Sequence, residues 1–138
     1  LARAGFSVTC SLPTSAPVVR FDAAALSQAV VNLLDNAAKY SGESREIVVR
    51  LQAADGYVTF EVEDHGVGIP AAEQSRIFER FYRAPNRTAT GGYGLGLFMV
   101  RHIMEAHGGR AEVESEPGRG SRFRLVFPVV TEWAHTAS

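Results

Sequence analysis

Two asparagines and a lysine recur at a spacing that would bring them together on one helix. Asn32, Asn36 and Lys39 are separated by four and three residues, so a helix would carry them on neighbouring turns of one face. Mg²⁺ prefers hard oxygen ligands and is usually held by few protein groups together with water and phosphate. Asn36 could supply an amide oxygen to the metal, Asn32 could position a water or orient Asn36, and Lys39 could reach a phosphate as a point charge. An exposed asparagine pair is also consistent with an ordinary solvated helix face.

An aspartate followed by two glycines forms the second informative segment, Asp64-His65-Gly66-Val67-Gly68-Ile69. Glycine lets the backbone approach a flat ring closely and adopt positive φ. A carboxylate beside such a backbone can accept a hydrogen bond from an exocyclic amine, such as that of adenine, and a buried pairing of this kind discriminates strongly between ligands. The alternative is a strand-end turn with a solvent-facing aspartate.

Three further glycines, Gly92, Gly94 and Gly96, precede an apolar helical pattern. Free N–H groups and the helix dipole attract anions at a helix start, so phosphates could bind there. The glycines do not follow a strand, which excludes the dinucleotide-binding fingerprint. Arg80, Arg83 and Arg87 lie between the aspartate and these glycines. Arginines can neutralise charge that develops in phosphoryl transfer, although at least one of the three is expected on an ordinary basic surface.

The elements that must position these residues can be read from the apolar periodicity. Asp22 is a suitable N-cap for a helix over Ala23–Tyr40. The core-facing stripe of that helix would consist of Leu26, Ala29, Val30, Leu33 and Ala37. Two alternating runs, residues 47–51 and 58–62, predict strands joined by a turn at Asp55-Gly56, which places Asp64 at a strand end.

The remaining elements complete a sheet with helices on one face. A second long helix is expected over Gly94–His107, closed by Gly108-Gly109, and a final hairpin is expected around Pro117–Gly120. Short strands are expected at Phe6–Cys10 and Val18–Phe21, and a short helix near Glu73–Phe81. Several antiparallel strands and two or three helices are most simply packed as an α/β two-layer sandwich.

The composition limits the possible classes of function but does not identify one. The 138 residues form one ordinary domain, with 46% hydrophobic and 21% charged residues in the globular range. A net charge of -1 gives no reason to expect nucleic acid or an anionic membrane surface as the main partner. The single cysteine, Cys10, excludes an internal disulfide and fits a reducing compartment. No apolar run is long enough to span a membrane, and the chain starts at Leu1, as a piece of a longer protein would.

Taken together, these segments resemble the catalytic ATP-binding domain of bacterial sensor histidine kinases. The chain is similar to that family at the N box (Asn32–Tyr40), the G1 box (Asp64–Ile69), the F box (Ile77–Arg83) and the G2 box (Gly92–Leu97). The similarity continues through the tail Val113-Glu114-Ser115 and Pro117-Gly118-Arg119-Gly120-Ser121. It covers nearly everything from Val18 to Pro128.

The resemblance implies a Bergerat ATP-binding fold, with a mostly antiparallel mixed sheet and helices on one face. It implies a catalytic domain over residues 1–130, an ATP lid over about 84–93, and a frayed tail over 131–138. The cofactors it implies are ATP and Mg²⁺. Asn36 would ligate the metal, and the other nucleotide-binding positions would be Asn32, Lys39, Tyr40, Asp64, Gly66, Gly68, Ile69, Gly92, Gly94, Leu95 and Gly96.

Within that set the resemblance implies distinct roles. Asp64 would bind the adenine amine, Tyr40 would lie near the base or ribose, and Asn32, Lys39 and Arg83 would assist phosphoryl transfer, with Arg83 contacting the γ-phosphate. Related gyrase-type ATPases carry a glutamate four residues before the metal asparagine, where it activates water. Here that position is Asn32, which is no base, so transfer onto a protein is favoured over hydrolysis.

The partners implied are the histidine-containing dimerisation domain of a parent kinase and its response regulator. His65, His102, His107 and His135 are not followed by Asp or Glu, so none matches the phosphoacceptor, and that domain is expected elsewhere. The domain would be cytoplasmic, without membrane contact of its own, in a parent anchored in the bacterial inner membrane. A non-catalytic ATP-binding switch, a gyrase-type ATPase and a serine-kinase anti-sigma factor are the alternatives.

Overall fold

The computed structural model describes residues 7–11, 21–40, 44, 46–79 and 96–129, the first of these ranges by its backbone only. Residues 18–20 of the strand expected over Val18–Phe21, the lid over 84–93 and the tail over 131–138 lie outside these residues. Within the described ranges, no helix is both long enough and apolar enough to cross a membrane.

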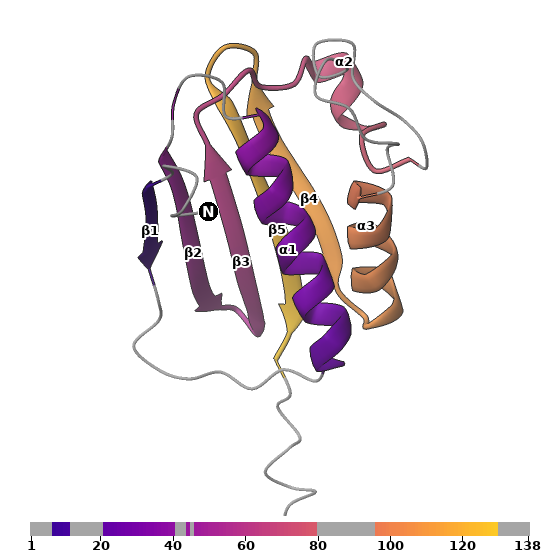
Figure 1. The fold of residues 1–138 in the computed structure, drawn as a ribbon. Helices are drawn as coiled ribbons and strands as arrows, with labels where there is room; N and C mark the ends of the chain where they lie inside the picture. Colours follow the sequence, from indigo (N-terminus) through magenta and orange to yellow (C-terminus); the bar gives the residue numbers. More distant parts are fainter. Residues whose placement is uncertain (1–6, 12–20, 41–43, 45, 80–95, 130–138) are drawn as a thin grey trace, which may run out of the picture.

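One sheet of five strands forms a layer of the molecule (Figure 1). Its strands are β1 (Ser7–Ser11), β2 (Glu46–Ala54), β3 (Tyr57–Asp64), β4 (Arg110–Glu116) and β5 (Gly120–Pro128). Their order is β1-β2-β3-β5-β4. β1 pairs with β2 in parallel, and the other three pairings are antiparallel.

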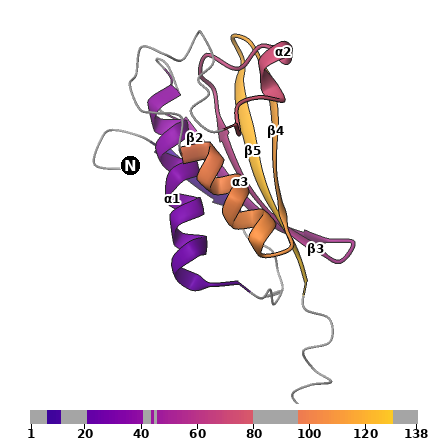
Figure 2. The same cartoon turned by 90° about the vertical axis from the view of Figure 1, so that its right-hand side faces the viewer.

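Two long helices, α1 (Ala23–Tyr40) and α3 (Gly96–Ala106), form the second layer. Figure 2 shows both on the same side of the sheet, and a short helix, α2 (Ala71–Gln74), lies at one end of it. The predicted two-layer α/β sandwich with a mixed, mostly antiparallel sheet is therefore confirmed.

The start of α1 is set by its cap, and its path over the sheet is set by its apolar stripe. The Asp22 Oδ1 atom accepts hydrogen bonds from the N–H groups of Ala24 (2.9 Å) and Ala25 (3.2 Å), as an N-cap should. Of the predicted stripe, Ala29, Leu33 and Ala37 are buried, and Leu26 and Val30 pack against the core. The predicted bounds of this helix are confirmed.

The end of α3 is a Schellman motif. Gly108 has a φ of 77°, its N–H bonds to the Glu105 carbonyl (3.2 Å), and the Gly109 N–H bonds to the Met104 carbonyl (2.9 Å). The predicted glycine stop is confirmed, but the helix ends at Ala106, so His107 already belongs to the turn. The His107 ring stacks on Phe21 with centroids 3.8 Å apart.

The helix-facing side of the sheet alternates with its outer side. Val58, Val62 and Asp64 of β3, together with Phe123 and Leu125 of β5, are buried under the helices. Charged residues alternate with them on the outer side, namely Glu61 and Glu63 of β3 and Arg122 and Arg124 of β5. This alternation makes Asp64 the one charged residue among the buried core-facing positions of the described strands.

The outer side of the sheet carries a closed ring of alternating arginines and glutamates. The pairs are Arg50–Glu61 (2.7 Å), Glu61–Arg124 (2.8 Å), Arg124–Glu114 (2.8 Å), Glu114–Arg122 (3.6 Å), Arg122–Glu63 (3.5 Å) and Glu63–Arg50 (2.6 Å). Burial alone would raise the pKa of Glu63, but the hydrogen bond from Arg50 and the charges of Arg122, Arg50 and His65 outweigh it and lower that pKa. The ring therefore favours the ionised form of Glu63.

Two predicted elements differ from the structure. The short helix is α2, over Ala71–Gln74, and residues 75–78 form turns, so the helix predicted near Glu73–Phe81 was misplaced. The helix starts earlier because Pro70 is its N-cap, whose carbonyl accepts the Glu73 N–H at 2.9 Å. It ends earlier because the Arg76 and Glu79 N–H groups bond to carbonyls only three residues back, which is tighter than an α-helix. Phe21 lies in no strand, since it directly precedes the cap of α1.

Candidate nucleotide-binding site

Three segments that are distant in sequence meet at one end of the sheet. The last turn of α1, the end of β3 and the start of α3 lie toward the same edge in Figure 1. The Val67 N–H donates to the Tyr40 carbonyl at 3.2 Å, which joins α1 to the turn after β3. The Asn32 Nδ2 group lies 3.4 Å from the Gly96 carbonyl, which joins α1 to the first residue of α3. The structure thus brings the N box, the G1 box and the end of the G2 box together.

The amide of Asn36 is half-buried on α1 and has spare bonding capacity. Its Nδ2 atom is buried and has no hydrogen-bond partner among the described residues. A buried amide atom left without a partner costs about 1–3 kcal/mol, which a bound ligand could recover. The two ends of an amide have nearly the same size and shape, so this side chain can turn to present either its nitrogen or its oxygen. A hard, uncharged oxygen donor here fits the requirements of Mg²⁺.

The two other polar residues on this face of α1 are arranged differently. The Asn32 Oδ1 atom accepts from Gln28 Nε2 at 3.0 Å while its Nδ2 atom contacts Gly96, so both ends of the amide are engaged. Lys39 is exposed in the last turn of the helix. An exposed ammonium on a flexible stem can reach a phosphate without prior ordering.

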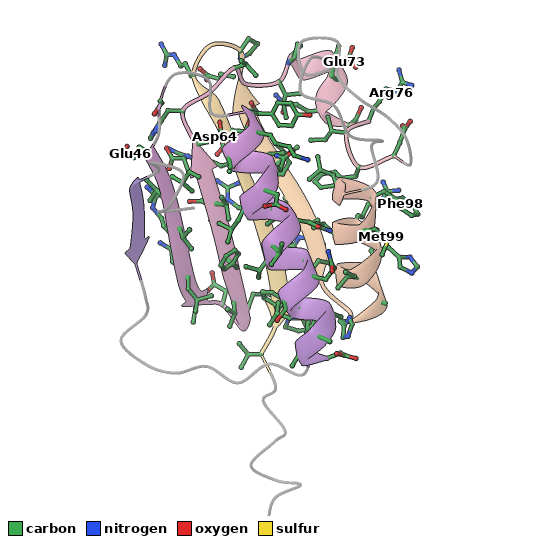
Figure 3. The ribbon with its side chains drawn as sticks, in the orientation of Figure 1. Glu46, Asp64, Glu73, Arg76, Phe98 and Met99 are labelled. Carbon is green, nitrogen blue, oxygen red and sulfur yellow. The ribbon has the colours of Figure 1, made fainter. Side chains whose placement is uncertain are left out.

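Asp64 is the last residue of β3 (Figure 3). Its side chain is buried, with only 2% of the residue exposed. Its Oδ1 atom accepts the Gly66 N–H at 2.9 Å, which fixes the carboxylate relative to the turn that follows. The neighbouring His65 is turned to the outer side of the sheet, where its ring nitrogens lie 3.4 Å from Glu46 and 3.2 Å from Glu63. The buried position of Asp64 excludes the predicted alternative of a solvent-facing aspartate.

The turn over Asp64–Ile69 is interlocked with the hairpin turn between β4 and β5. Gly68 has a φ of 70°, and a Cβ atom there would lie 2.0 Å from the Glu116 carbonyl oxygen. Gly120 has a φ of 105°, and its Cβ atom would lie 2.0 Å from the Asp64 carbonyl oxygen. Only glycine fits either position, because any side chain would collide with backbone. Gly66 and Ile69 are also buried in this turn.

A hollow of about 270 Å³ opens beside this interlock. It is lined by Glu63, Asp64, Glu114, Ser115, Glu116, Arg119, Gly120, Ser121 and Arg122. Asp64 is the one residue of the predicted site among them, and most of the other side chains belong to the outer side of the sheet. The hollow is therefore a feature of the β4–β5 turn, and it does not correspond to the predicted nucleotide-binding site, because Asn36 of α1 does not line it.

Several predicted site residues lie outside the described part of the chain. They are Arg83, Gly92, Gly94 and Leu95, together with Arg80 and Arg87 of the arginine cluster. Gly96 is the first residue of α3. The predicted roles of these residues stay predictions.

Sequence reasoning gave no role to three polar residues that contact the turn. Ser115, Ser121 and Gln74 form hydrogen bonds among themselves or with the turn backbone, and Ser121 is only 3% exposed. The alternation of the strands was the sequence signal that could have identified the two serines. Ser115 and Ser121 occupy core-facing positions in β4 and β5, where a hydroxyl needs a partner.

The chain matches one family model and many curated proteins. The family model describes the histidine kinase-, DNA gyrase B-, and HSP90-like ATPases and matches residues 21–131. The alginate biosynthesis sensor protein KinB of Pseudomonas aeruginosa is 37% identical over 123 residues, which are 89% of this chain and 20% of that protein. The signal transduction histidine-protein kinase/phosphatase MprB of Mycolicibacterium paratuberculosis is 45% identical over 112 residues, covering 78% of this chain and 22% of that protein.

Solved structures agree with this assignment. The mycobacterial sensor histidine kinase MprB has a TM-score of 0.80 at 32% identity, covering 93% of this chain and 85% of that one. Full-length ShkA in complex with AMPPNP has a TM-score of 0.79 at 31% identity, covering 93% of this chain and 26% of that one. The chain spans only about a fifth to a third of the curated relatives. By its match to the family model over residues 21–131, the chain belongs to the histidine kinase-, DNA gyrase B- and HSP90-like ATPase family.

Proposed function

We propose that this chain is the catalytic domain of a sensor histidine kinase and that it binds ATP together with Mg²⁺. The observation that carries the proposal is that α1 is bonded both to the turn after β3, through Tyr40 and Val67, and to the start of α3, through Asn32 and Gly96. We infer that the half-buried Asn36 amide of α1, the buried Asp64 carboxylate and the start of α3 serve one ligand. An amide oxygen, an acceptor for an amine and a helix start are the groups that a metal-bound purine triphosphate requires.

Each end of the nucleotide would meet a different segment. The Asp64 carboxylate accepts a hydrogen bond from the exocyclic amine of adenine. The backbone at Gly66 and Gly68, which carries no side chains, lies against the adenine ring. Tyr40, which is half-buried and joined to the turn through its carbonyl, borders the base or ribose. Gly92, Gly94, Leu95 and Gly96 contact the phosphates, and Arg83 contacts the γ-phosphate. Asn36 would hold Mg²⁺, which would neutralise phosphate charge when bound.

The reaction is transfer of the γ-phosphoryl group to a histidine on another domain. A lone pair of the acceptor imidazole nitrogen forms a P–N bond to the γ-phosphorus, while the bond from that phosphorus to the β,γ-bridging oxygen breaks and ADP leaves. The proton on the other ring nitrogen is then lost to solvent. Lys39 and Arg83 supply positive charge to the phosphates, and Asn32 acts through the contact between α1 and α3.

Hydrolysis is the weaker candidate because no described residue at the metal face can activate water. The position of the gyrase-type glutamate is Asn32, whose amide is already engaged by Gln28 and Gly96. An amide side chain does not take up a proton near neutral pH, so it cannot act as a general base.

The partners follow from the proposed reaction. They are the histidine-containing dimerisation domain of the parent kinase and the response regulator that receives the phosphoryl group. We place the domain in the cytoplasm of a parent anchored in the bacterial inner membrane, in keeping with the sensor proteins it resembles.

Calorimetric titration with ATP and GTP, each with and without Mg²⁺, tests the binding step. We expect ATP to bind more tightly than GTP, whose ring carries a carbonyl where adenine carries the amine. We also expect Mg²⁺ to strengthen ATP binding. Equal affinity for both nucleotides, or binding indifferent to Mg²⁺, would contradict the proposal.

Transfer is tested by mixing the chain with candidate dimerisation domains and γ-labelled ATP. Acid-labile label on the cognate domain, absent when its acceptor histidine is replaced by glutamine, is the expected result. ATP binding without transfer to the cognate domain would favour a non-catalytic switch. Steady release of phosphate by the chain alone would favour an ATPase.

A further inference from the structure

The tail segment Ser115–Ser121 matches the histidine kinase pattern, yet none of the roles proposed above uses it. It forms the end of β4, the hairpin turn and the start of β5, and it lies against the turn over Asp64–Ile69. The Gly118 N–H donates to the Val67 carbonyl at 2.9 Å, and Gly120 lies directly against the backbone of Asp64. The turn that carries Asp64 therefore rests on this hairpin.

One hydroxyl, that of Ser115, connects the turn to the hairpin. The Ser115 Oγ atom accepts the Ile69 N–H at 2.8 Å and donates to the Gly120 carbonyl at 2.7 Å. It also lies 2.9 Å from the Ser121 hydroxyl. Because its one proton goes to Gly120, the Ser121 hydroxyl must donate to Ser115. All bonding positions of this oxygen are then filled.

Gln74, from α2, closes the same arrangement from the other side. Its Nε2 group donates to the Ile69 carbonyl at 2.9 Å and to the Ser115 carbonyl at 2.8 Å. Both amide protons are used, one on the turn and one on β4. Ile69 is thus held through its N–H by Ser115 and through its carbonyl by Gln74.

The consequence for the site follows from the geometry of the turn. Asp64 is fixed at one end by its place in β3 and by its bond to the Gly66 N–H. The other end of the turn is fixed at Ile69 by Ser115 and Gln74. If either bond at Ile69 is lost, Gly66 and Gly68 can move, since glycine has the widest conformational freedom of any residue.

We propose that Ser115 and Gln74 are positioning residues that set the preference for adenine by holding the turn between Asp64 and Ile69. The proposal rests on the proposed function, because it assumes that Asp64 reads the amine of the base. Neither residue need touch the nucleotide. Substituting either residue should weaken recognition of the base and leave the Mg²⁺-dependent gain in affinity unchanged.

The test compares Ser115→Ala with Ser115→Thr and with Ser75→Ala, an exposed serine on the adjoining turn. ATP, GTP and ADP are titrated with and without Mg²⁺, at temperatures where circular dichroism shows each variant folded. Ser115→Ala leaves the Ile69 N–H without its partner, so we expect ATP affinity to fall about tenfold and GTP affinity to change little. Ser115→Thr keeps the hydroxyl and should retain most of the preference, and Ser75→Ala should match the wild type.

Gln74→Glu is the second variant, in case Ser115→Ala does not fold. It keeps the size of the side chain but turns an acceptor toward two carbonyls, so the ATP-to-GTP preference should fall at least as far as in Ser115→Ala. In both variants the factor by which Mg²⁺ strengthens ATP binding should remain that of the wild type.

The outcomes separate this inference from the function beneath it. If the wild-type chain binds no adenine nucleotide, the proposed function itself fails. If the wild type prefers ATP and the Ser115 and Gln74 variants keep that preference, Ser115 and Gln74 do not position the turn. A loss shared equally by ATP and GTP, or a loss confined to Mg²⁺-bound nucleotides, would also overturn the inference.

Discussion

The two halves of the candidate site differ in how many of their polar groups already have hydrogen-bond partners in the folded chain. At the Asp64 end, the turn is held by Ser115, Gln74 and the backbone of the β4–β5 hairpin. On α1, the Asn36 amide keeps a buried atom without a partner among the described residues, and Lys39 extends into solvent. Under the proposed function, the fold itself would hold the end of the site that reads the base, whereas the metal and phosphate end would be completed by the ligand. The comparison also separates substitutions that damage the fold from those that damage only binding.

The largest effect is expected where the two turns touch. Gly68→Ala places a Cβ atom 2.0 Å from the Glu116 carbonyl oxygen at a φ of 70°, so strand ends must separate. We expect a loss of unfolding free energy on the order of 4 kcal/mol, measured by urea unfolding.

Gly118→Ala is the matched control for that substitution. Its φ is 80°, but a Cβ atom there would meet nothing within 4 Å. Its cost should be the backbone strain alone, about 1 kcal/mol. If both variants lost the same free energy, contact between the turns would not be what requires glycine at position 68.

At the metal end of the site, Asn36→Ala should weaken the binding of Mg²⁺ and ATP without destabilising the fold. The substitution removes a half-buried amide whose buried Nδ2 atom has no partner among the described residues, so the unfolding free energy should stay constant or rise. The Mg²⁺-dependent gain in ATP affinity should fall by about 10- to 100-fold, measured by calorimetry. Asp35→Ala, at the exposed neighbouring position, serves as the control and should retain that gain. An unchanged metal dependence in Asn36→Ala would remove Asn36 from the metal site.

Glu63→Gln tests whether the outer ring of charges supports the strand that ends in Asp64. The pKa of Glu63 lies below its ordinary value of 4.5, so its stabilising effect is complete above that pH and is lost as pH falls through the lower folded-state pKa. The variant should lose on the order of 1 kcal/mol at neutral pH.

The difference between wild type and Glu63→Gln should then shrink below about pH 4.5, where the wild-type carboxylate is protonated too. Urea unfolding at several pH values measures both effects. A difference that stays constant down to low pH would mean that ionisation of Glu63 does not stabilise the fold.

The smallest effect is expected for Asn32→Ala. The contact between its amide and the Gly96 carbonyl is long, at 3.4 Å, and lies near the surface, so stability should fall by less than about 1 kcal/mol. If instead ATP affinity collapsed while stability was kept, Asn32 would contact the nucleotide directly. Isothermal titration with ATP and thermal unfolding of the same preparation distinguish a loss of affinity from a loss of stability.

Local pattern was sufficient for the elements whose ends carry their own signals. Asp22 caps α1 where predicted, and the turn residues Asp55 and Gly56 have φ of 54° and 81°, as a tight hairpin turn requires. The short helix was placed wrongly because four residues give too little periodicity to set its ends. The residues Gln74 and Ser115 were missed as contacts because their partners lie on other elements.

By itself the sequence determined the helix on which Asn32, Asn36 and Lys39 lie, the strand that ends at Asp64, and the family to which their combination belongs. These follow from periodicity, caps and turns, which act over a few residues. Only the tertiary structure decided that Gly120 lies against Asp64, that Ser115 holds Ile69, and that six charges close a ring across β2, β3, β4 and β5. Such contacts depend on strand register and on packing between distant segments, and no short stretch of sequence contains that information.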